Sequence, residues 1–106
     1  MSVGDRRART EEAKSLAYAR DMAALMQVAA NQSGLEATFQ GSSVGIEITV
    51  PAGTLSDAGA RSVAWSSADA LRRGRPEEPW HVNVLANGLC LVEADYHPVT
   101  RRISVR

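Results

Sequence analysis

The sequence contains few of the residues that identify the common functional classes. Its 106 residues include one cysteine, two tryptophans, two tyrosines and one phenylalanine, and its formal net charge is zero. The lone cysteine, Cys90, excludes an intramolecular disulfide and a structural zinc site. Zero net charge excludes a global field that would attract nucleic acid or an acidic membrane. No glycine-rich phosphate loop is present, so no cofactor is predicted. The spacing of Glu93 and Asp95 on a strand matches no metal motif, so no metal is predicted.

Long apolar segments are also missing. No stretch approaches the ~20 apolar residues that a membrane-spanning helix needs. The N-terminal segment contains arginines but no apolar run behind them, so we expect no secretory signal. These absences favour a cytoplasmic location and exclude a membrane from the expected partners.

What the chain does contain is the composition of one small folded domain. Hydrophobic residues make up 44% of the chain and charged residues 23%, which are ordinary values for a globular protein. The polar residues 1–9 are predicted to form a flexible N-terminus. Residues 10–106 are long enough for one hydrophobic core and are predicted to form a single domain.

Two segments have the 3.6-residue apolar spacing of amphipathic helices. The first is predicted to begin at Thr10, an N-cap candidate, and to end at Gly34, which suits the left-handed conformation after a helix. The second is predicted to begin at Thr54 or Ser56 and to end near Gly74. Residues 35–40 and 44–50 alternate as strands around a turn at 41–43, and residues 101–106 alternate as a last strand.

Residues 80–96 are predicted to form a central hairpin around Asn87-Gly88, a dipeptide that suits a type I′ turn. This turn would place Ala86 opposite Leu89 and Val84 opposite Leu91. Both faces of the hairpin would then be apolar, so we expect it to be covered on both sides. One face carries Trp80, Val82, Val84, Ala86, Leu89 and Leu91; the other carries His81, Asn83, Leu85, Cys90, Val92, Ala94 and Tyr96.

The predicted fold is therefore α+β, in the order α-β-β-α-β-β-β, with a largely antiparallel five-stranded sheet and two helices. This order resembles the core of roadblock and profilin-like domains, which are largely interaction scaffolds. The helix that closes the roadblock arrangement has no counterpart in the predicted order.

The leading functional hypothesis is a small interaction protein without catalytic activity. Two helices are too few to cover five strands on both sides, so apolar surface would be left for a second copy or another protein. A homodimer or a partner-binding adaptor, inhibitor or chaperone would use it. The candidate interface residues are Trp65, Leu85, Val92 and Tyr96.

Two alternatives stay open. If the arginine clusters converge, they would form a phosphate-binding patch for nucleic acid or a nucleotide. Its candidate residues are Arg72, Arg73, Arg75, Arg101, Arg102 and Arg106. A small-ligand or enzyme site is the third hypothesis, since carboxylate, imidazole and phenol groups cluster at the end of the hairpin. Its candidate residues are His81, Asp95, Tyr96 and His97.

Overall fold

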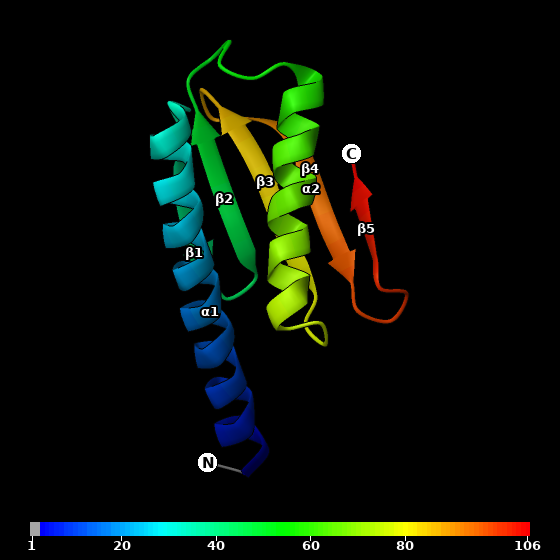
Figure 1. The fold of residues 1–106 in the computed structure, drawn as a ribbon. Coiled ribbons are helices and arrows are strands. Elements are labelled where there is room, and N and C mark those ends of the chain that lie inside the picture. Colours follow the sequence, from blue (N-terminus) through cyan, green and yellow to red (C-terminus); the bar gives the residue numbers. More distant parts are fainter. Residues whose placement is uncertain (1–2) are drawn as a thin grey trace.

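The computed structural model describes the backbone of residues 3–106 and the side chains of residues 9–106. The predicted element order is confirmed, in one unit with two helices and five strands (Figure 1). In chain order the elements are α1 (Val3–Ser33), β1 (Thr38–Ser42), β2 (Gly45–Val50), α2 (Asp57–Gly74), β3 (Trp80–Ala86), β4 (Leu89–His97) and β5 (Arg102–Val105).

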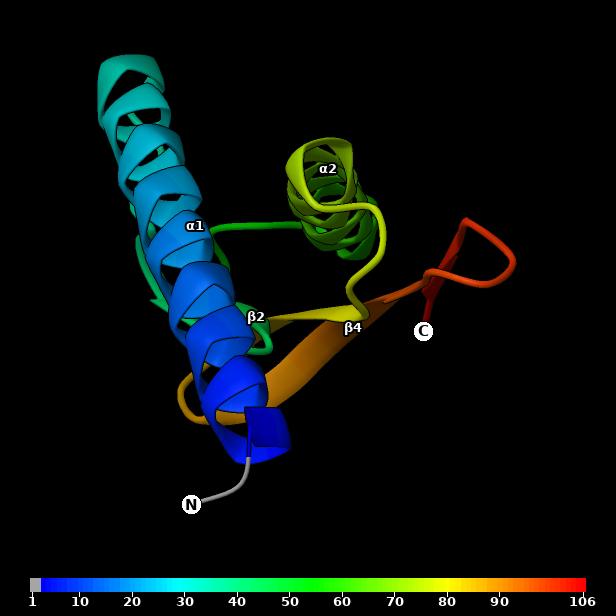
Figure 2. The same ribbon diagram turned by 90° about the horizontal axis from the view of Figure 1, so that it is seen from below.

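The five strands form one mixed sheet in the order β1-β2-β3-β4-β5. Three of the four pairings are antiparallel, and β2 and β3 are parallel because α2 carries the chain back between them. Both helices lie on the same face of the sheet (Figure 2). The molecule therefore has two layers, and β1 and β5 are its two edge strands.

The helix ends follow the predicted signals with one exception. Gly34, with φ of 77°, ends α1, and the Ser56 hydroxyl caps α2 by accepting from Gly59 N at 3.0 Å. The prediction that Thr10 caps the first helix is wrong, because α1 already begins at Val3. Residues 3–9 contain no proline and only one glycine, so helix formation continues past the cap signal. Flexibility of residues 1–9 stays a prediction, and residues 1–2 lie outside the described residues.

The first hairpin is shifted along the chain relative to the prediction. Gly41 and Ser42 belong to β1, and the turn is formed by Ser43 and Val44. A β-carbon on Gly41 would lie 2.6 Å from backbone atoms of Ala19 and Arg20 in α1. Gly41 is therefore the place where the helix touches the strand, a role that its turn propensity conceals.

The central hairpin has the predicted turn but not the predicted register. Asn87 and Gly88 have φ of 52° and 76°, as a type I′ turn requires. Leu85 pairs with Cys90, but Val84 pairs with Val92, so the register shifts at this point. Leu91 is the extra residue of a β-bulge. A shift of one residue moves every following side chain of β4 to the opposite face.

The predicted two-sided apolar hairpin is therefore wrong. Val92, Ala94 and Tyr96 lie on the same face as Val82 and Val84, beneath the helices, and all five are at most 2% exposed. One face of the sheet collects the core, together with the closely packed alanines of α2. The core side chains of the sheet are Ile46, Ile48, Val50, Trp80, Val82, Val84, Ala86, Val92, Ala94 and Tyr96.

Within residues 3–106, neither helix has the length and hydropathy that crossing a membrane requires.

Candidate interaction edge of the sheet

The face of the sheet opposite the helices is largely polar. It carries a charged cluster that spans β3, β4 and the residue after β5. His81 Nδ1 lies 2.7 Å from Asp95 Oδ1, and Arg106 pairs with both Asp95 and Glu93. Partial burial raises the pKa of Asp95, but hydrogen bonds and charge from His81 and Arg106 outweigh this and lower the pKa. The cluster thus favours the ionised form of Asp95.

The four residues of the predicted ligand site come together, but their polar groups are largely engaged. They line a shallow depression of about 310 Å³ with Val44, Pro79 and Trp80. However, the Tyr96 ring is 2% exposed and its hydroxyl donates to Pro76 O at 2.7 Å. The Asp95 oxygens are occupied by His81 and Arg106. The depression therefore offers few free polar groups to a ligand.

The six predicted arginines are divided among separate places. Arg75 lies toward the other side of α2, where it pairs with Glu11 at 2.8 Å and with Glu78. Arg106 belongs to the charged cluster of the open face. Arg75 therefore does not converge with the others, and Arg106 lies at the end of β5 opposite to Arg101 and Arg102.

The remaining four arginines gather near β5. Arg72 and Arg73 share the carboxylate of Asp69, at 2.6 and 2.8 Å. Arg72 Nη1 also donates to the backbone carbonyl of Arg101 at 3.2 Å, so the end of α2 meets the turn before β5. Arg101 and Arg102 are exposed and have no ion-pair partner within residues 9–106.

Two of the four predicted interface residues lie in the core. Val92 and Tyr96 are 1% and 2% exposed, because the bulge turns them toward the helices. Leu85 lies half-buried on the open face. Trp65 is 42% exposed on α2, and the Arg72 guanidinium lies 5.5 Å from its ring centroid.

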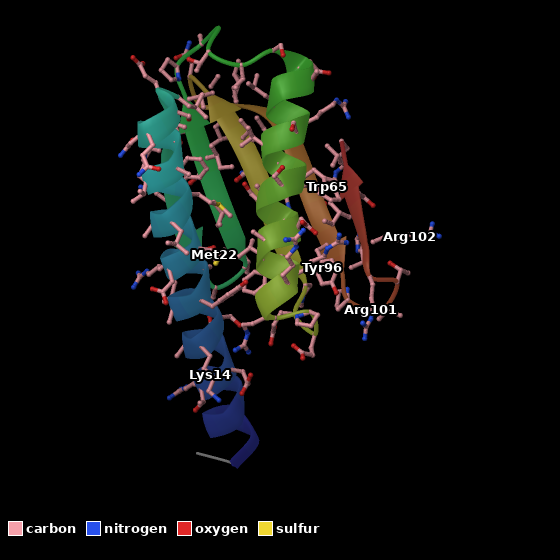
Figure 3. The ribbon with its side chains drawn as sticks, in the orientation of Figure 1. Lys14, Met22, Trp65, Tyr96, Arg101 and Arg102 are labelled. Atoms are coloured by element: carbon pink, nitrogen blue, oxygen red, sulfur yellow. The ribbon has the colours of Figure 1, made fainter. Side chains whose placement is uncertain are left out.

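Trp65 stands on the side of α2 that faces β5. Trp65, Asp69 and Arg72 follow one another at spacings of four and three residues, so they share one side of the helix. Arg72 on this side reaches the turn before β5. Figure 3 shows Trp65 on the side of α2 toward β5, and Arg101 and Arg102 at the start of β5.

The edge of the sheet at β1 is closed by α1. The Gln27 amide donates to Ala37 O at 2.7 Å and accepts from Phe39 N at 3.0 Å. One side chain thus satisfies a donor and an acceptor that a further strand would otherwise bind. The sequence contains no signal for this contact, because it depends on the packing of α1 against β1 and not on a local pattern around Gln27.

The edge at β5 is open. Glu93 and Arg106 exchange two backbone hydrogen bonds, at 2.7 and 2.8 Å. In an antiparallel pair such bonded positions alternate with positions whose N–H and C=O groups point away. The register from Arg106 back to Arg102 has no shift, so the groups of Ile103 and Val105 point to the free edge. No strand within residues 3–106 pairs with them.

Comparison of the chain with protein-family models, with curated proteins and with solved structures found no match. No group of three or more His, Cys, Asp or Glu side chains within the described part of the chain is arranged to hold a metal ion. The function is therefore inferred from the geometry of the edges and of the open face.

Proposed function

We propose that the protein is an interaction module without catalytic activity, which binds an extended segment of a partner protein along the free edge of β5. The observation that carries the proposal is the unpaired edge of Ile103 and Val105. An edge strand presents a row of backbone donors and acceptors that a further strand can pair with. Proteins usually cover such an edge, as α1 and Gln27 do at β1.

Side chains around the edge support the same proposal. Ile103 and Val105 are only partly buried and extend the core toward the edge. Trp65 adds an exposed aromatic ring on the flank of α2 that faces them. Tryptophan rings are common anchors of protein interfaces because they bury a large area with few rotatable bonds.

Catalysis and nucleic-acid binding are supported less well. Asp95 is engaged by His81 and Arg106, so its carboxylate is not free to act as a base. Within residues 9–106 the phenylalanine, tryptophan and tyrosine rings of the sheet, Phe39, Trp80 and Tyr96, all face the helices and offer no stacking platform on the open face. Four of the six candidate arginines pair with carboxylates, and Arg75 lies apart from the other five. Cytoplasmic location and homodimer formation stay predictions.

A single amino-acid substitution that removes one backbone N–H tests the proposal. Proline at Val105 removes an N–H that points to the free edge and takes no part in pairing with β4. Peptides of ten residues would be selected for binding to the wild-type protein from a random displayed library. We expect Val105→Pro to weaken the selected peptides at least tenfold in fluorescence anisotropy, and Val105→Thr, which keeps the N–H, to change the Kd less than twofold.

A measurement on the wild-type protein avoids any doubt about the folding of the proline variant. Peptide binding is expected to slow hydrogen exchange at the amides of Ile103 and Val105, because both gain a hydrogen-bond acceptor. Exchange at Phe39, whose amide already donates to Gln27, is the internal control. The proposal fails if the library yields no peptide that protects the two β5 amides.

A further inference from the structure

We infer that the segment bound at β5 is acidic on one face and apolar on the other, which deepens the proposed function and rests on it. The inference follows from the two faces of β5 itself. Arg102, Ser104 and the following Arg106 lie on the open face, while Ile103 and Val105 face α2. Side chains of an added strand lie beside those of β5 on the same face, so each face selects its own residues.

The charges around the edge are predominantly positive. Five arginines surround it, against three carboxylates. The arginines are Arg72, Arg73, Arg101, Arg102 and Arg106; the carboxylates are Asp69, Glu93 and Asp95. This excess occurs in a chain whose formal net charge is zero, so it is a local property of this edge. Opposite charges facing each other across a strand pair stabilise the pair, and like charges destabilise it.

Arg102 contributes most directly to the expected preference for an acidic segment. It is exposed, has no ion-pair partner within residues 9–106, and projects from β5 on the open face. Arg106 follows at the other end of the strand and is 62% exposed although it pairs with two carboxylates. Two carboxylates spaced four residues apart on an added strand would lie opposite these two arginines.

A second copy of the chain fits the edge less well than an acidic segment. Two-fold antiparallel pairing of β5 with itself about Ser104 would place Arg102 opposite Arg106 of the other copy. Two such contacts would occur in each dimer, and both would be repulsive. On its helix side the edge offers Ile103, Val105 and the exposed ring of Trp65, which suit β-branched or other apolar residues.

Three peptides with the same apolar positions test the inference. Each has nine residues and carries valine at alternate positions, with glutamate, lysine or serine between them. Binding is measured by anisotropy at low salt, below the concentration at which each peptide associates with itself. We expect the glutamate peptide to bind at least tenfold more tightly than the lysine peptide, with the serine peptide between them. Its affinity should fall as salt is added.

Charge reversal provides the matched variants. Arg102→Glu is expected to weaken the glutamate peptide at least fivefold and to strengthen the lysine peptide. Arg20→Glu makes the same change at an exposed position of α1, near the closed edge, and should leave both affinities within twofold. If Arg102→Glu leaves the ranking of the peptides unchanged, the inference is wrong.

The outcomes separate this inference from the proposed function. Equal binding of the three peptides, abolished by Val105→Pro, would support strand addition and overturn the acidic preference. Selective binding of the glutamate peptide that Val105→Pro does not affect would support the preference and overturn strand addition. A ten-nucleotide single strand of thymidine serves as the nucleic-acid probe. If it binds more tightly than the glutamate peptide, and Arg102→Glu weakens its binding, the inference is overturned in favour of nucleic acid. Absence of binding by all three peptides would overturn it as well.

Discussion

The two edge strands of this sheet, β1 and β5, are of similar length, but they differ in what covers their outward backbone groups. At β1 the α1 helix packs so closely that only glycine fits at position 41, and Gln27 binds the outward backbone groups on either side of Thr38. At β5 the outward backbone groups of Ile103 and Val105 have no such partner, and arginine side chains stand around them. An exposed edge invites association, and charge is one of the ways in which proteins limit it. The difference is between an edge that α1 covers and an edge whose backbone groups are unpaired within residues 3–106.

The largest expected effect comes from filling the contact between α1 and β1. Gly41→Ala would bring a β-carbon to 2.6 Å from three backbone atoms of α1, none of which can move independently. We expect a loss of about 3 kcal/mol in the free energy of unfolding. Urea denaturation followed by circular dichroism measures it.

Gly59→Ala is the matched control for this substitution. Its β-carbon would meet the Ser56 hydroxyl at 3.3 Å, and alanine is favoured over glycine inside a helix. Its unfolding free energy should therefore stay close to that of the wild type. Equal losses in the two variants would mean that the closed edge does not depend on close packing at Gly41.

A smaller effect is expected from opening the β1 edge. Gln27→Ala leaves Ala37 O and Phe39 N without their partner, which should cost about 1.5 kcal/mol. The variant is also expected to associate as its concentration rises, because two edges are then free. Light scattering on a size-exclusion column and urea denaturation measure the two consequences.

Gln32→Ala, at an exposed position of the same helix, is the matched control and should change neither stability nor association. A Gln27→Ala protein as stable and as monomeric as the Gln32→Ala protein would contradict the role given to Gln27.

The smallest expected effect concerns the charged cluster that orients Arg106 beside the open edge. The folded-state pKa of Asp95 is lowered from its ordinary value of 3.8, so ionised Asp95 stabilises the fold above that value. This contribution is lost as the pH falls through the lowered pKa. Asp95→Asn should therefore cost about 1 kcal/mol at pH 7, and the difference from the wild type should shrink below pH 4.

Thermal unfolding between pH 2 and pH 7 measures this dependence. Asp57→Asn, which removes an exposed carboxylate paired with Arg61, provides the comparison and should shift the unfolding temperature less at pH 7. A constant difference between Asp95→Asn and the wild type across the whole range would show that the Asp95 charge does not stabilise the fold.

Sequence patterns predicted the elements of this fold better than they predicted its surfaces. Asn87-Gly88 and Gly34 occupy their expected conformations because positive φ is a local property of those residues. Apolar periodicity located both helices and all five strands, because the period is also set by residues close together in the chain. The candidate site was predicted only in fragments: His81 lies beside Asp95, and Arg72 lies beside Arg101, but Tyr96 and Val92 are in the core. A hairpin register deduced from the turn alone does not include the bulge at Leu91.

The sequence by itself determined the order of the elements, the end of α1, both ends of α2 and the turn of the central hairpin, because each depends on residues within a few positions of one another. Only the tertiary structure decided that both helices cover one face, that β4 shifts its register, and that Gln27 reaches the edge of β1. These features depend on contacts between segments that are distant in the chain, where the packing of one element selects the conformation of another. The contrast between a closed edge and an open one arises at this level.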